Sequence, residues 1–172
     1  MSYIHFRLNP DGTVGSVMAY DSDPGYSGSD DVVVEYDYDP SSEFISALEL
    51  SEDKTSVVNK YAGQTLDEQK ASYEADAKAK QLATEKQRLK ERIKSLVSDL
   101  IEPLENDEKK AKEVDATNGN LNKQREIAIY RSSVRAANNA HEEILDSLTD
   151  FDEVQNFDPD WRKNFTGTKP SI

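Results

Sequence analysis

The chain has 172 residues, of which 35% are hydrophobic and 32% are charged, and its formal net charge is −13. A conventional spherical core of this length would be short of apolar residues, so the composition favours an elongated protein whose helices bury a narrow apolar stripe. The negative charge argues against sequence-independent binding of DNA or RNA, which requires clustered Lys and Arg. We therefore expect no nucleic-acid partner.

The sequence contains no cysteine, and its only histidines are His5 and His141. These counts exclude thiolate chemistry and a histidine-rich metal site. No apolar run reaches the length of a membrane span, and the N-terminus lacks the apolar stretch of a signal peptide. We expect a protein that is made in a cytoplasm and is not inserted in a membrane.

The N-terminal segment has the pattern of short β-strands. Apolar and polar residues alternate over residues 3–8, and Asn9-Pro10-Asp11-Gly12 is typical of a hairpin turn. Residues 13–20 are predicted to return as the second strand, with Gly15 at a bulge. Residues 32–36 are predicted to form a third strand.

Two further elements complete a predicted head module over residues 1–63. Asp39 followed by Pro40 is typical of a helix start and predicts a short helix that reaches Leu48. Residues 49–61 predict a second small hairpin. The module is acidic, because it holds 12 Asp and Glu against three Lys and Arg.

A long helix is predicted from Leu66, because the sequence is then rich in Ala, Lys, Glu and Leu and contains no Gly or Pro before Pro103. A heptad register over this helix predicts a seam, that is, a stripe of residues at the a and d positions that packs against another helix. The apolar side chains of this seam are larger in the C-terminal half of the helix. The larger seam residues are Leu82, Leu89, Ile93, Leu96 and Leu100.

A strong turn signal at residues 116–120 precedes a second heptad run. Its seam residues include Ile127, Val134, Ile144 and Leu148, with His141 at an a position. The two helical runs could fold back as an antiparallel pair within one chain. Alternatively, each run could contribute to a coiled coil between chains, which makes a homo-oligomer, with a trimer among the options.

Residues 154–172 carry Trp161 and Phe165 without helical periodicity and are predicted to form an irregular docking tail. Two large aromatic side chains on an aperiodic terminus are costly to expose, so we expect them to anchor in a partner protein. Packing on the chain's own helices is the alternative. The sequence as a whole predicts an α+β, mainly α protein, with a β-rich head (1–63), long helices (64–153) and a tail (154–172).

No catalytic constellation is recognisable, so we expect no enzymatic activity, cofactor or metal site. The segment Asp21-Ser22-Asp23 begins like a calcium loop. However, Tyr26 and Val32 occupy the positions where that loop requires glycine and a bidentate acid. A solvated turn is the simpler interpretation.

The order of parts in the head resembles a small module of bacteriophage tail proteins. The resemblance rests on the segments 3–8, 32–37 and 39–44, followed by the paired segments 47–50 and 56–59. It implies a structural component of a virion tail or baseplate that contacts neighbouring tail proteins.

Two other roles remain open at this stage. The chain could be a tail-fibre assembly chaperone, since the head followed by a coiled coil also resembles such proteins. It could instead be a module that binds host saccharide. In that case the tyrosines of the head would form the binding surface, namely Tyr20, Tyr26, Tyr36 and Tyr38.

Overall fold

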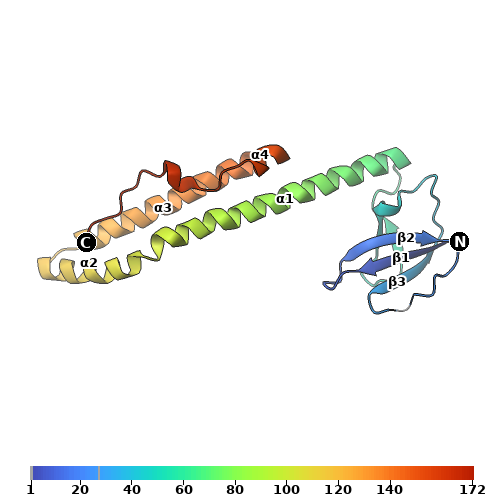
Figure 1. The fold of residues 1–172 in the computed structure, drawn as a ribbon, viewed down its shortest axis with the longest axis horizontal. Coiled ribbons are helices and arrows are strands. Elements are labelled where there is room, and N and C mark those ends of the chain that lie inside the picture. The colour runs from blue at the N-terminus through green and yellow to red at the C-terminus, as the bar shows by residue number, and fades with distance from the viewer. Residues whose placement is uncertain (1, 27) are drawn as a thin grey trace. The chain divides into compact units, whose positions relative to one another are not determined.

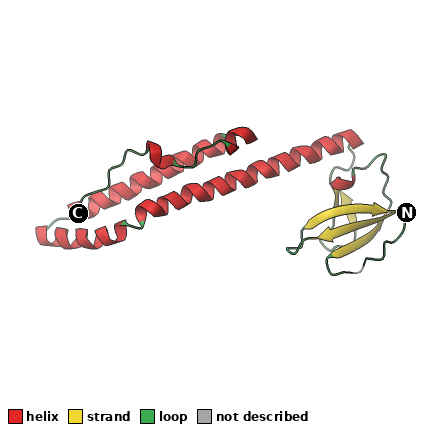
Figure 2. Ribbon diagram, in the orientation of Figure 1, coloured by secondary structure: helices red, strands yellow, loops and turns green. Residues whose placement is uncertain are grey.

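A computed structural model describes residues 2–26 and 28–172 of the chain. The predicted fold class is confirmed: the protein is α+β, with a small N-terminal sheet module followed by helices (Figure 1, Figure 2). The chain packs as two units, residues 1–78 and 79–172. The first unit therefore extends beyond residue 63, where the sequence placed the end of the head.

The first unit is built on a three-stranded antiparallel sheet with the order β2-β1-β3. These strands are β1 (Ser2–Leu8), β2 (Val14–Tyr20) and β3 (Asp31–Tyr36), as the sequence predicted. The register passes from Arg7 opposite Ser16 to Leu8 opposite Val14. Gly15 is thus the extra residue of a bulge.

A second, two-stranded sheet pairs β4 (Leu48–Leu50) with β5 (Val57–Asn59) and confirms the predicted small hairpin. The helix expected from Pro40 is wrong, because only the 3₁₀ turn η1 (Ile45–Ala47) forms. The side chain of Asp39 accepts hydrogen bonds from the backbone N–H and the hydroxyl of Ser41, at 2.9 and 2.7 Å. Such local bonds favour a turn over a helix.

The core of the first unit lies against the inner face of the three-stranded sheet. Ile4 and Phe6 of β1 are completely buried and pack with Leu48 of β4. Alternate residues of β1 therefore point inward, as the alternating sequence pattern predicted.

The beginning of helix α1 (Leu66–Ile101) belongs to the first unit. A reciprocal capping interaction starts the helix: Thr65 N–H donates to Glu68, whose own N–H contacts the Thr65 hydroxyl. One turn later, Gln69 is 2% exposed and accepts the Phe44 N–H at 3.0 Å. Tyr73 packs edge-on against the ring of Phe44. These contacts explain why the unit extends past residue 63.

The second unit is an antiparallel helical hairpin with a short helix and a tail. Pro103 separates α1 from α2 (Leu104–Asn118), and Gly119, at φ 65°, makes the turn before α3 (Asn122–Ser147). Helix α3 lies alongside α1 and α2 (Figure 1). Of the two arrangements that the sequence left open, the structure has the hairpin within one chain.

The carboxylate of Asp115 fastens the turn of the hairpin. Asp115 is buried, and its two oxygens accept the backbone N–H groups of Lys123 and Gln124, both at 3.0 Å. Burial opposes ionisation of this carboxyl, but the N–H donors of Gln124 and Lys123 outweigh burial and lower its pKa. The side chain thereby caps the first turn of α3 from the neighbouring helix.

The last helical heptads do not form one continuous helix. Helix α3 ends at Ser147, and a separate helix α4 (Phe151–Gln155) begins after Asp150, whose side chain accepts the N–H groups of Asp152 and Glu153. The tail also contains the 3₁₀ turn η2 (Trp161–Asn164). Cap formation by Asp150 explains this interruption, because an aspartate at this position favours a new helix start.

The position of the unit boundary makes a prediction about fragments. A fragment of residues 1–78 should fold with a cooperative thermal transition, because it retains Gln69 and Tyr73. A fragment of residues 1–63 should melt at a markedly lower temperature or remain unfolded, since it loses the buried partner of Phe44. Circular dichroism and dispersion of amide proton signals measure both. Equal stability of the two fragments would contradict the prediction.

Candidate functional site

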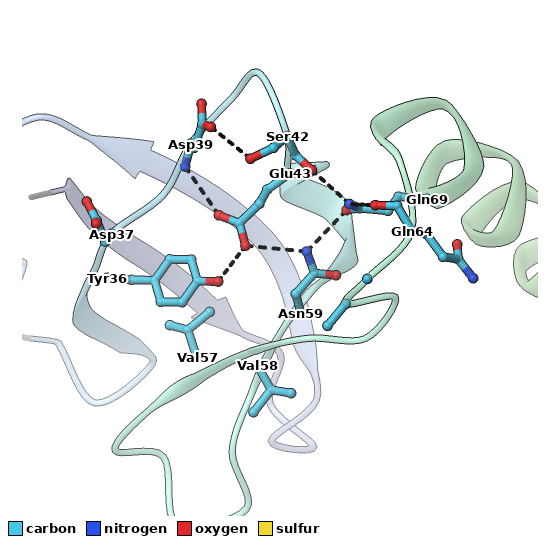
Figure 3. Close-up of a pocket in the computed structure, with 12 residues that line it drawn as sticks. Tyr36, Asp37, Asp39, Ser42, Glu43, Val57, Val58, Asn59, Gln64 and Gln69 are labelled. Carbon is cyan, nitrogen blue, oxygen red and sulfur yellow. Dashed lines mark hydrogen bonds between the residues drawn. The ribbon is translucent and has the colours of Figure 1, made fainter.

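A polar recess of about 600 Å³ lies in the first unit, between the segment that follows β3, strand β5 and the start of α1 (Figure 3). Glu43 lies at its centre. The other lining residues are Tyr36, Asp37, Asp39, Ser42, Val57, Val58, Asn59, Ala62, Gly63, Gln64 and Gln69.

The carboxylate of Glu43 is held by donors on two sides. It accepts the Tyr36 hydroxyl at 2.6 Å and the Asp39 backbone N–H at 3.2 Å. Asn59 approaches it at 3.4 Å. Burial, and next the hydrogen bond to Glu43, raise the pKa of Tyr36 to about 12. Tyrosine is protonated at neutral pH in any case, and the Tyr36 hydroxyl is the donor in this hydrogen bond.

Gln69 satisfies its polar atoms in the same recess. Its carbonyl accepts Phe44 N–H and Asn59 Nδ2, and its amide nitrogen donates to the carbonyls of Ser42 and Gln64 at 2.8 and 3.0 Å (Figure 3). A buried amide with all its hydrogen bonds made stabilises and orients the backbone around it. The recess is thus a structural junction that fastens α1 to the head. No local sequence pattern indicates this junction, because Gln69 lies 25 residues from Phe44.

The four tyrosines considered for saccharide binding do not form one surface. Tyr36 and Tyr38 pack against the core, and their hydroxyls donate to Glu43. Tyr20 and Tyr26 instead gather around His5, with ring centroids 6.3 and 4.4 Å from the imidazole. The four tyrosines therefore form two separate pairs, Tyr36 with Tyr38 and Tyr20 with Tyr26.

His5 lies beneath Tyr26 on the outer face of the three-stranded sheet. The residue is 2% exposed, and its Nε2 lies 2.7 Å from Asp31 Oδ1. Among residues 2–26 and 28–172, no three His, Cys, Asp or Glu side chains converge as metal ligands would. Within the same residues, no helix is both long and apolar enough to cross a membrane.

The predicted seam lies in the core of the second unit. Most of its residues are buried or half-buried there, packed among residues of α1, α2 and α3 of the same chain. These side chains thus follow the alternative of an antiparallel pair within one chain, because the helices of the same chain cover one another. The residues concerned are Leu82, Leu89, Ile93, Leu96, Leu100, Ile127, Val134 and Leu148.

Ile144 is the exception, with 54% of its surface exposed, whereas the neighbouring Leu145 is completely buried. The helix has 3.6 residues per turn, so Leu145 lies five full turns after Ile127 and shares its face. A strict seven-residue repeat drifts by about 20° per heptad relative to a straight helix. The heptad register thus placed the seam at Ile144, one residue away from the buried stripe.

The tail packs on the chain's own helices, which corrects the prediction that it anchors in a partner. Trp161 is 3% exposed, and its indole N–H donates to the carbonyl of Ile93 at 3.4 Å. Phe165 is partly buried, edge-on to both Trp161 and Tyr130. His141 also holds the tail, through its Nε2 at 2.8 Å from the Asp158 carbonyl.

The phase of α3 can be tested with two neighbouring alanine variants. Leu145→Ala should lower the free energy of unfolding of the helical unit by about 2–5 kcal/mol, because it leaves a cavity in the core. Ile144→Ala should change it by no more than about 0.5 kcal/mol, since that side chain is exposed. Chemical denaturation followed by the helical circular dichroism signal measures both. Similar losses would show that Ile144 is buried in solution.

The docking of the tail predicts that Trp161→Ala destabilises the helical unit by about 3–5 kcal/mol. Lys163→Ala is a matched control in the same turn, because its ion pair with Asp158 is exposed to solvent and contributes little to stability. Thermal melting of the full chain compares them. A Trp161→Ala protein as stable as the control would restore the idea of a free anchor.

In comparisons with known proteins, no family model, curated protein or solved structure matches the chain. The resemblance to phage tail modules therefore rests on the sequence segments alone.

Proposed function

We propose that the protein is a non-enzymatic structural component of a phage tail or baseplate that links neighbouring tail proteins. The observation that carries the proposal is the division of the chain into two units with separate cores, which share one uninterrupted helix, α1. A chain of this kind offers two independent surfaces for partners. The tail-like order of strands in the head supports the same role.

The arrangement of polar groups also supports a role other than catalysis. In the recess, Glu43 and Gln69 use their hydrogen bonds to fasten backbone segments, and the Tyr36 hydroxyl donates to Glu43. A catalytic base or nucleophile needs a free lone pair directed at a substrate.

A tail-fibre assembly chaperone is the second candidate function. It is favoured by the closure of the apolar seam within one chain, because a chain that buries its own seam can remain monomeric while it binds a partner transiently. The linking role requires lasting incorporation, whereas the chaperone role requires release.

Light scattering tests whether the seam is closed within one chain, and mass spectrometry of particles separates the two roles. Light scattering should give a mass near the 19.3 kDa of one chain, because the seam is internal. A larger stable mass would show that an additional self-association surface exists. Mass spectrometry of purified phage particles should then detect the chain in a fixed ratio to the tail proteins. Its complete absence from particles would reject the linking role and favour the chaperone.

A further inference from the structure

The outer edge of strand β2 lacks two features that usually protect an exposed strand, namely charged residues and proline. Among the described residues, no strand pairs with this edge, since β2 is the first strand of the order β2-β1-β3. Turn η1 comes close to β2 but exchanges no backbone hydrogen bond with it. Unpaired N–H and C=O groups on such an edge can pair with another extended chain.

Strand β2 is also unusual in composition for this protein. Its sequence, VGSVMAY, contains no charged residue and no proline, although 32% of the whole chain is charged. The opposite edge strand, β3, carries Asp31 and Glu35. Natural proteins place charges on edge strands to prevent pairing with other chains. By this criterion β3 is protected and β2 is open, apart from the bulge at Gly15.

The outer side of β2 presents an apolar and aromatic surface. Met18 is 40% exposed and lies opposite His5 on β1, so both side chains share the outer face. Tyr26 is 48% exposed and stacks on His5, and Tyr20 lies edge-on to Tyr26 with 6.1 Å between ring centroids. Tyrosine faces attract the cationic side chains of Lys and Arg.

Acidic residues bracket this uncharged strand in the sequence. Asp11 lies in the turn before β2, and Asp21 and Asp23 follow its last residue. Asp11 is ionised at neutral pH like any exposed aspartate, and hydrogen bonds from Thr13 lower its pKa further. Like charge on a second copy of the head would oppose pairing of two β2 strands, whereas a cationic segment is attracted.

We infer that the β2 edge is a strand-addition site for an extended, basic segment of a partner protein. The segment pairs its backbone with β2, its apolar centre lies beside Met18 and Tyr20, and its Lys or Arg residues reach the acids at either end of the strand. This mode of recognition combines main-chain hydrogen bonds, which give affinity, with side-chain contacts, which give specificity. The inference does not depend on the proposed place in a virion.

A synthetic peptide provides the test with the full-length protein. The probe has alternating valine and threonine residues between lysines at both ends, and its partner probe has glutamates in place of the lysines. Amide NMR titration should show that the lysine peptide shifts the signals of residues 14–20 and slows their hydrogen exchange. The glutamate peptide should bind at least about tenfold more weakly, because it meets like charges.

Two variants locate the site. Met18→Lys places a like charge beside the incoming peptide and should weaken binding at least about tenfold. Val58→Lys is the matched control, since Val58 is an exposed apolar residue (52%) on the other sheet and its change should leave binding unaltered. If Met18→Lys fails to fold, Ser16→Lys on the same outer face replaces it.

Three results would overturn the inference. Equal binding of the glutamate peptide would show that charge does not select the segment. Signal changes confined to residues outside β2 would show that the peptide does not bind at this edge. A dimer whose β2 amides are already protected without peptide would assign the edge to a second copy of the chain.

Discussion

The packing of α3 against α1 and α2 within one chain is the contact on which the helical unit depends. Ile93, Ile127, Val134 and Leu145 are almost completely buried in it, and each such aliphatic side chain contributes about 1.5–3 kcal/mol relative to an exposed one. The same contact creates the surface on which Trp161 lies. Docking of the tail therefore depends on the hairpin, because Trp161 donates to the carbonyl of Ile93 and Phe165 packs against the ring of Tyr130.

Polar contacts fix the details of this apolar packing. Lys90 of α1 pairs with Asp146 of α3 at 2.6 Å, and Arg131 of α3 pairs with Glu108 of α2 at 2.6 Å. Partly exposed ion pairs of this kind contribute little to stability. However, both pairs are consistent with one alignment of α3 along α1 and α2, in the same way as charged pairs beside a coiled-coil seam.

The head depends on a different kind of contact, since its apolar core is small and a buried polar network completes it. Gln69, from α1, joins the backbone at Phe44 and Ser42 to the side chain of Asn59. The sheet module and the first turns of the helix therefore form a single folding unit. The polar recess of the head is thus occupied by structural hydrogen bonds, while its open strand edge is the better candidate for recognition.

Local patterns of sequence were sufficient for most elements. Alternation over residues 3–8, the Asn-Pro-Asp-Gly turn, the bulge at Gly15 and the proline-free run after Leu66 are local signals, because strand alternation, turn geometry and helix propensity act over a few residues. The interruption after Ser147 is also encoded locally, by the cap at Asp150, but the heptad pattern that continues to Phe151 predicts one unbroken helix there.

What the sequence by itself determined is therefore the order of the strands and long helices, and the presence of an apolar stripe on each long helix. Whether those stripes meet within one chain was decided only by the tertiary structure, because a heptad pattern is satisfied equally by a partner helix from any source. The exact face of α3 was also decided there, since a straight helix follows 3.6 residues per turn and buries Leu145 in place of Ile144. The role of Gln69 needed the fold as well, because a polar residue shows its partners only when distant segments come together.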